Sequence, residues 1–215
     1  MAQTARTLIS TPTAHTGPAI DTLAVRVAGV LFFSLAAQFM TVIMLAASMA
    51  PNYDAAGGAI SDLGVIRETA ALFNVSLVAV GVLNIAGGFL FFRRHGRAWI
   101  LAIFAVAGIG AIGAGLVPLN ASDLHGLFAL AAFLFFNSEA LASAAVLTGP
   151  MRAISIAAGV AGLAFVILMV IGDSGSPGVF GAIGHGGAER MIVYPVMLWM
   201  LALGGYLIAT ASPLE

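Results

Sequence analysis

Six long runs of apolar residues alternate with short polar segments along the chain. A helix that spans a bilayer needs about 20 predominantly apolar residues, and each run approaches or exceeds that length. The runs are continuous instead of alternating between apolar and polar residues, which disfavours a membrane β-barrel. The pattern therefore predicts an all-α fold, a polytopic bundle of six transmembrane helices over residues 27–50, 70–92, 98–117, 124–147, 153–171 and 188–208.

The polar residues at the two ends of the chain set the expected domain organisation. Residues 1–22 are rich in Thr and Pro and lack the short apolar core of a signal peptide. We expect a disordered tail over residues 1–24, a six-helix domain over residues 25–210, and a C-terminal tail over residues 211–215.

Arginine placement predicts the orientation in the membrane. The chain has eight cationic residues besides His, and all are Arg. With six helices, six of the arginines fall on one side of the membrane and only Arg67 and Arg190 on the other. Because cytoplasmic loops carry the excess of positive charge, both termini are expected in the cytoplasm, with the chain in the plasma membrane of a prokaryote.

Composition supports membrane lipid as the main partner. Hydrophobic residues make up 61% of the chain and charged residues 8%, against about 25% charged residues in a soluble domain. A net charge of −1 gives no basis for a nucleic-acid partner, and the absence of Cys excludes thiol chemistry. No cofactor is indicated, and metal content and oligomeric state stay open.

Polar residues gather on the side opposite most of the arginines, which predicts a polar pocket at the outer surface. Asp62, His125 and Glu189 are the candidate catalytic residues, since they come from three outer segments and supply acid–base groups. The candidate binding residues are Asn52, Ser61, Asn74, His185 and Arg190.

Each candidate also has a structural interpretation. Asp62 is suited to cap a short helix in the loop, and His125 to an exposed position at a helix start. Glu189 and Arg190 are suited to ion pairs with the first outer loop. His185 lies four residues before Glu189, but Gly186 and Gly187 argue against a helix through both.

The outer ends of the second, fourth and sixth predicted helices are all N-termini, which carry partial positive charge. If they converge near Arg67 and Arg190, they form a site for an anion such as a lipid phosphate. A metal site from Asp62, His125, His185 and Glu189 fits in ligand type, although no pair has a diagnostic spacing.

Glu139 is an acid within the fourth apolar run. An acid at that depth is costly, and we expect it to be buried and hydrogen-bonded to Gln38 or Asn84 on another helix. The alternative is a role in proton or ion movement.

Four motifs together resemble the prokaryotic membrane family known as domain of unknown function 998. They are Pro51-Asn52-Tyr53 with Ile60-Ser61-Asp62-Leu63-Gly64, Leu72-Phe73-Asn74-Val75-Ser76-Leu77, Leu124-His125-Gly126-Leu127, and Gly186-Gly187-Ala188-Glu189-Arg190-Met191-Ile192-Val193-Tyr194-Pro195. A looser similarity links the chain to the six-helix Frag1/DRAM/Sfk-like proteins, which implies an association with lipid. Neither resemblance implies a catalytic mechanism.

Three functions follow as alternatives. The chain is a lipid-associated protein, with or without enzymatic activity, that uses an outer pocket. Otherwise it is a small transporter or channel with a polar path across the bilayer, or a membrane scaffold in which the outer charges only fasten loops.

Overall fold

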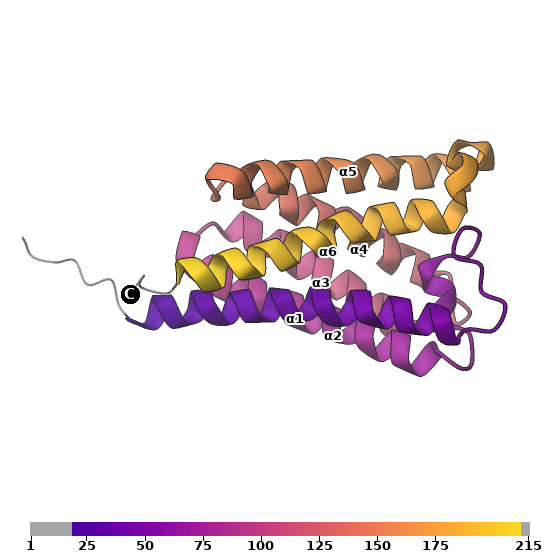
Figure 1. Cartoon of the computed structure of the whole chain (residues 1–215), viewed down its shortest axis with the longest axis horizontal. Coiled ribbons are helices and arrows are strands. Elements are labelled where there is room, and N and C mark those ends of the chain that lie inside the picture. Colours follow the sequence, from indigo (N-terminus) through magenta and orange to yellow (C-terminus); the bar gives the residue numbers. More distant parts are fainter. Residues whose placement is uncertain (1–18, 212–215) are drawn as a thin grey trace, which may run out of the picture.

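The structure is a computed structural model that describes residues 19–211, and this part of the chain is built from six long helices (Figure 1). The helices are α1 Ala19–Met49, α2 Ala70–His95, α3 Ala98–Leu116, α4 Leu124–Ser143, α5 Gly149–Asp173 and α6 Gly184–Thr210. Two 3₁₀ helices, η1 Ile60–Gly64 and η2 Pro177–Ile183, lie in the connections. Each of the six long segments is apolar and long enough to cross a membrane, which confirms the predicted fold class.

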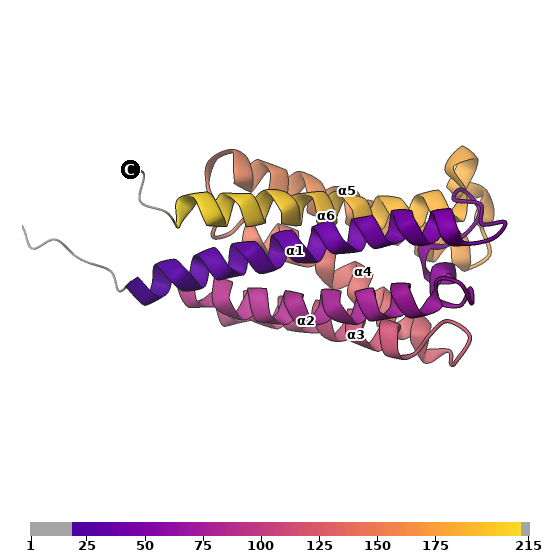
Figure 2. The same ribbon diagram turned by 60° about the horizontal axis from the view of Figure 1, so that its bottom comes forward.

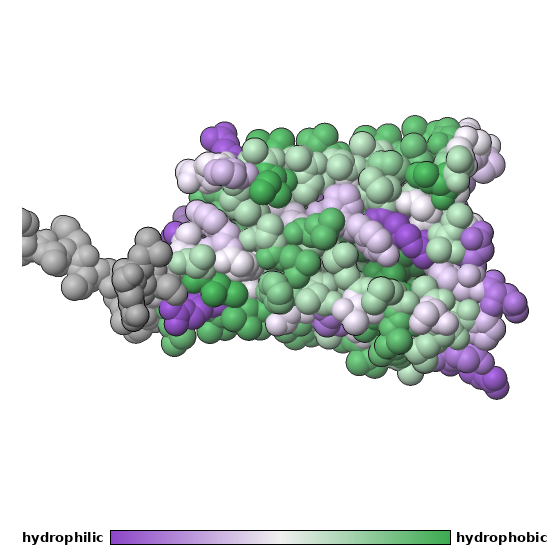
Figure 3. Space-filling model, viewed as in Figure 1, coloured by the Kyte–Doolittle hydropathy of each residue, from purple (hydrophilic) through white to green (hydrophobic). Residues whose placement is uncertain are grey.

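The six helices run side by side and close into a ring (Figures 1 and 2). Each helix packs against its neighbours in sequence, α6 returns to pack against α1, and α4 also touches α6, so that α5 lies outside the α4–α6 pair. The space-filling view is apolar along the length of the bundle and hydrophilic mainly toward its ends (Figure 3). This pattern is typical of a bundle that contacts lipid around its sides.

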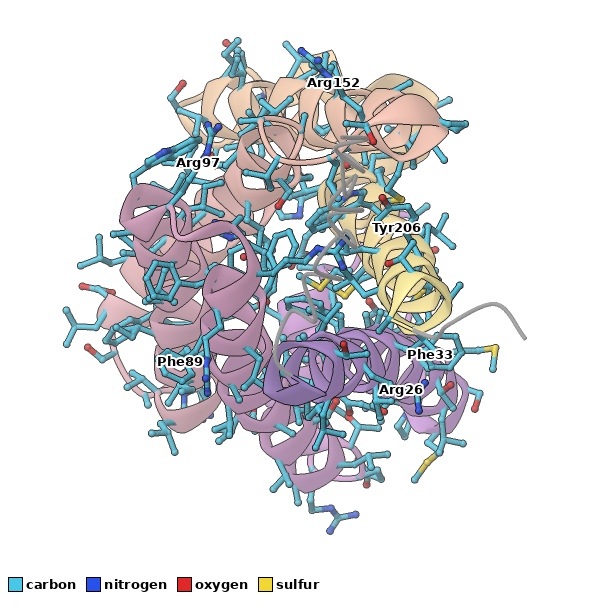
Figure 4. All side chains as sticks on the ribbon, turned by 90° about the vertical axis from the view of Figure 1, so that its left-hand side faces the viewer. Arg26, Phe33, Phe89, Arg97, Arg152 and Tyr206 are labelled. Carbon is cyan, nitrogen blue, oxygen red and sulfur yellow. The ribbon has the colours of Figure 1, made fainter. Side chains whose placement is uncertain are left out.

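The two ends of the bundle differ in their loops. One end, here called the loop end, carries residues 50–69, 117–123 and 174–183, which include η1 and η2. The opposite end, here called the arginine end, carries the start of α1, the end of α6 and two short connections. Arg26, Arg97 and Arg152 lie around the periphery of the ring in the view from this end (Figure 4).

Several helix boundaries differ from those predicted, and the largest differences lie in α1, α4, α5 and α6. Helix α1 begins at Ala19 instead of residue 27, because the helix continues beyond the apolar run. Residues 19–24, which were predicted to belong to the tail, are therefore part of this helix. The rest of the predicted tails, residues 1–18 and 212–215, lies outside the described part of the chain. Helix α4 ends at Ser143, where the chain tightens into turns with bonds between residues three apart. Helix α6 begins at Gly184, so the expected interruption at Gly186 and Gly187 is wrong.

Glycine allows two of the closest contacts in the bundle. A Cβ on Gly204 of α6 would lie 2.7 Å from the carbonyl oxygen of Gly29 on α1. A Cβ on Gly186 would overlap the carbonyl of Gly58, and the Gly186 N–H instead donates to Ala56 O at 2.9 Å. Glycine at position 186 therefore lets the first loop pack directly against the start of α6, which positions η1 over the interior of the ring.

Candidate functional site

A cavity lies inside the ring at the loop end, between η1 and helices α1, α2, α3, α4 and α6. It contains about 60 Å³ that the centre of a water molecule can reach, and about 580 Å³ free of protein atoms when the part open to the surroundings is included. Most of its wall is aliphatic and aromatic, with polar side chains from Ser61, His125, Asn137 and Glu189. We call it the loop-end cavity.

Glu189 is the acid of the loop-end cavity and is 3% exposed. Its Oε2 accepts the backbone N–H of Ile60 at 2.6 Å, and its Oε1 accepts the hydroxyl of Ser61 at 3.0 Å. Both donors belong to η1, so one carboxyl group joins α6 to a loop helix that lies 129 residues earlier in the chain. The predicted ion pair with the first loop is wrong for Glu189, because its partners are an amide and a hydroxyl.

His125 lies in the first turn of α4 and is 5% exposed, so it is not the water-exposed histidine of the structural interpretation. Its Nδ1 is 2.8 Å from the carbonyl oxygen of Val117. A carbonyl only accepts, so Nδ1 carries the hydrogen, and Nε2 of the uncharged ring is an acceptor. Nε2 is buried without a protein partner, and the ring lines the loop-end cavity.

Asp62 and Asn74 fix η1 without lining the cavity. The Asp62 carboxylate accepts the backbone N–H of Ala59 at 2.9 Å, so Asp62 is the N3 residue that bonds back to the N-cap, which is Ala59. Asn74 of α2 donates to the carbonyl of Gly64 at 2.8 Å. The structure thus brings His125 and Glu189 to one cavity and places Asp62 at N3 of η1, not at the predicted N-cap position.

The guanidinium group of Arg190 forms hydrogen bonds with the loop between α1 and α2. Its Nη1 donates to the carbonyls of Ala55 and Gly186 at 2.7 and 2.8 Å, and its Nη2 donates to the Tyr53 hydroxyl at 2.7 Å. Burial raises the pKa of Tyr53 more than the bond and charge of Arg190 lower it. Arg190 was expected in an ion pair; its partners are instead carbonyls and a phenol, which leaves its charge without a carboxylate in the described bonds.

Asp54 orders the exposed tip of the same loop. Its carboxylate accepts the backbone N–H groups of Ala56 at 3.1 Å and Gly57 at 2.9 Å. These two bonds hold the pKa of Asp54 below its ordinary value. The loop therefore has its own local order in addition to the contacts with α6.

The other predicted site residues lie away from the cavity. Asn52 has a left-handed backbone conformation, with φ of 57°, in the turn after α1. His185 pairs with Asp173 through Nε2 and Oδ1 at 3.1 Å. Arg67 pairs with its neighbour Glu68 at 2.9 Å, and its side chain is 93% exposed.

The two arginines of the predicted anion site lie outside the loop-end cavity. Neither Arg67 nor Arg190 lines the loop-end cavity. Of the four polar side chains that line it, Ser61 and Asn137 donate to protein partners, and the Glu189 carboxyl and Nε2 of His125 are acceptors. An anion beside these two acceptors would face like charge or lone pairs.

A second polar cluster lies deeper in the ring and consists of Asn84, Glu139 and Ser143. All three residues are fully buried, and Asn84 Nδ2 donates to Glu139 Oε2 at 3.1 Å. This bond confirms the predicted partner on another helix. Gln38 is not that partner, because its side chain exchanges hydrogen bonds with Ser76.

Among residues 19–211 there is no group of three or more acids and histidines that could hold a metal ion. The metal-site alternative is therefore without support in the described part of the chain. Sequence reasoning did not single out Asn137, which lines the cavity and donates to Ile192 O of α6 at 3.2 Å. An amide within an apolar run was the available signal.

Comparison with known proteins gives one family. The model of a family described as "Protein of unknown function (DUF998)" matches residues 27–206. No curated protein and no solved structure matches the chain. The looser similarity to Frag1/DRAM/Sfk-like proteins therefore stays a resemblance.

Proposed function

The chain belongs to the DUF998 family of proteins of unknown function, and for this member we propose that the loop-end cavity binds an amphipathic, lipid-like molecule whose head group donates hydrogen bonds. The observation that carries the proposal is the gradient of polarity along the cavity. Ser61, His125 and Glu189 lie at the loop end, and the deeper wall is formed mainly by apolar side chains such as Phe136, Val196 and Met197.

The dimensions of the cavity fit part of an extended apolar chain. Along α4 the lining residues run from His125 to Asn137, a distance of about 18 Å at the helical rise of about 1.5 Å per residue. Ligand sites are typically concave and mainly apolar, with a few polar groups that fix orientation. The loop-end cavity has this composition, and a lipid-like molecule is available to a bundle embedded in a bilayer.

The polar end selects the head group by hydrogen-bond direction. Nε2 of His125 has no protein partner, and the Glu189 oxygens keep lone pairs beyond the two bonds to η1. Both positions favour a donor such as a hydroxyl or an amine. A phosphate or carboxylate head group is disfavoured by the same geometry.

Binding has more support than catalysis. The Ser61 hydroxyl donates to Glu189, whose other oxygen accepts the Ile60 amide, and the His125 ring donates to the Val117 carbonyl. Among the described bonds, none joins His125 to Ser61 or to Glu189, so the site has no serine–histidine pair. Hydrogen-bonded nucleophile and base groups are what acyl-transfer sites require. His125 and Glu189 are therefore proposed as head-group ligands, and Ser61, Asn74 and Asp62 as supports of η1, in a protein of the prokaryotic plasma membrane.

The test is extraction of the protein from its native membrane followed by mass spectrometry of bound small molecules. Ala129 lines the cavity, and Ala129→Phe fills it, whereas Ala86 on α2 is exposed and Ala86→Phe serves as the matched control. We expect a hydroxyl- or amine-bearing lipid that is retained by wild type and Ala86→Phe and lost from Ala129→Phe. Equal retention by the two variants contradicts binding in the cavity.

A further inference from the structure

Buried polar atoms without a protein partner follow the inner faces of α2 and α4 from one end of the bundle to the other. They include His125 Nε2, Asn84 Oδ1, Glu139 Oε1, Ser143 Oγ and His95 Nε2. Most buried polar groups in proteins have a partner, and those that lack a protein partner are commonly satisfied by water. A series of such atoms at successive depths is therefore an observation that needs an explanation.

The residues on each helix share one face. On α4, Glu139 and Ser143 follow His125 by 14 and 18 residues, or about 3.9 and 5 helical turns. On α2, His95 follows Asn84 by 11 residues, or about three turns. The two faces meet inside the ring through the Asn84–Glu139 bond at 3.1 Å, although α3 separates the two helices in sequence.

The loop-end cavity runs from His125 to about one helical turn short of Glu139, and neither Glu139 nor Asn84 lines it. His125 lines its outer part, and Phe136 and Val80 line its deeper part. Glu139 and Asn84 follow these two residues by three and four positions, about one helical turn of 5.4 Å. Beyond Glu139, Ser143 is about one further turn toward the arginine end, where His95 completes the series.

Glu139 is the acid in this series and has no charged neighbour at its depth. Helix α3 carries no titratable residue between its ends. Apart from Glu139 and from Tyr194 in the middle part of α6, the titratable residues of the other long helices lie toward the helix ends. They are Asp21, Arg26, Arg93, Arg94, His95, His125, Arg152, Asp173, His185, Glu189, Arg190 and Tyr206. A carboxyl group inside a membrane without a cation is typical of proton relays.

We propose that Glu139 is the central group of a proton path through the bundle. The path enters at His125 through the loop-end cavity and leaves past Ser143 and His95. In each passage one Glu139 carboxyl oxygen gains a proton from water on the cavity side and releases a proton toward Ser143, so only O–H bonds form and break. The path goes beyond the proposed ligand site, because it requires no bound lipid.

The test is proton flux into liposomes that contain the full chain and a pH-sensitive dye, driven by a potassium gradient with valinomycin in Na⁺-free buffer. The variants are Glu139→Gln and the control Ser138→Ala, which changes the partly exposed neighbouring residue. We expect flux through wild type and Ser138→Ala, and the rate of protein-free liposomes with Glu139→Gln. Wild-type flux no faster than protein-free liposomes, or undiminished flux with Glu139→Gln, overturns the proposal.

Carbodiimide labelling of wild type gives a second measurement that is independent of how the variant folds. Dicyclohexylcarbodiimide adds to protonated carboxyl groups in apolar surroundings, and peptide mass spectrometry locates the adduct. We expect an adduct on Glu139 together with loss of flux. Flux that persists after Glu139 is labelled overturns the path, and lipid retention measured on the same preparations reports separately on the ligand site.

Discussion

Glu189 provides the sharpest test of how the loop-end cavity is built. Glu189→Ala removes the acceptor of the Ile60 amide and of the Ser61 hydroxyl, and Ile60 is only 2% exposed. A buried donor left without an acceptor costs about 1–3 kcal/mol of unfolding free energy. The Ile60 amide and the partly exposed Ser61 hydroxyl together give a loss of about 2–5 kcal/mol. We therefore expect a clearly lower melting temperature, by about 2–4 °C per kcal/mol.

Glu189→Gln separates stability from ligand binding. The amide oxygen of Gln accepts the Ile60 N–H, and its NH₂ group donates to a reoriented Ser61 hydroxyl, so the fold loses about 1 kcal/mol or less. Inside the cavity, however, an acceptor is replaced by a donor. This variant should melt close to wild type and lose the co-purified molecule.

The assay is thermal unfolding in detergent, followed by near-ultraviolet circular dichroism, with lipid retention measured on the same samples. Glu68→Ala is the control, because Glu68 forms an exposed pair with Arg67, and such pairs contribute about 0–1 kcal/mol. If the Ala and Gln variants of Glu189 melt at the same temperature as wild type, the carboxyl does not fasten η1 and the reasoning is refuted.

Three further predictions follow from other parts of the structure. Single cysteines in Ser122→Cys and Thr148→Cys, at opposite ends of the bundle, should label from opposite sides, with Ser122→Cys reacting from outside; the reverse result contradicts the predicted orientation. Ser155→Ala leaves the buried Trp199 Nε1, now bonded at 2.7 Å, without an acceptor and should lower unfolding stability by about 1–3 kcal/mol; an unchanged melting curve contradicts this. The pKa of Asp54 is lowered, so its charged carboxylate stabilises the turn at pH values above the ordinary pKa, and this stabilisation is lost as the pH falls through the lowered pKa. Protection of the two bound amides from hydrogen exchange should fall in that pH range in wild type, whereas Asp54→Asn should show no such pH-dependent step.

The sequence predicted the six helices because burial of backbone groups in lipid requires long, apolar, helical segments. It also predicted that Glu139 bonds to Gln38 or Asn84, since polar side chains at one depth in a membrane need one another, and Asn84 is the partner. These two results depend only on position along the helix axis, which the sequence gives directly.

The apolar character of the cavity could not be predicted, because it depends on the rotation of each helix. Leu127 is 62% exposed while Phe136 on the same helix is 5% exposed, yet both are apolar. In a soluble helix the polar face marks the outside, but lipid removes that distinction. The sequence also does not show that Arg190 binds carbonyls, although a bond from Asp62 to a free amide of a short loop helix was one of the two interpretations it offered.

Closure of the ring by α6 has a consequence for biogenesis. Five helices can enter the membrane in order as the ribosome produces them, but the cavity lacks one wall until α6 arrives. Until then, η1 lacks the Glu189 carboxyl, and the Ile60 amide has no acceptor from α6. Assembly of the site is thus the last event of membrane insertion, and a chain arrested before Gly184 should be a target for quality-control proteolysis even though five of its helices are in place.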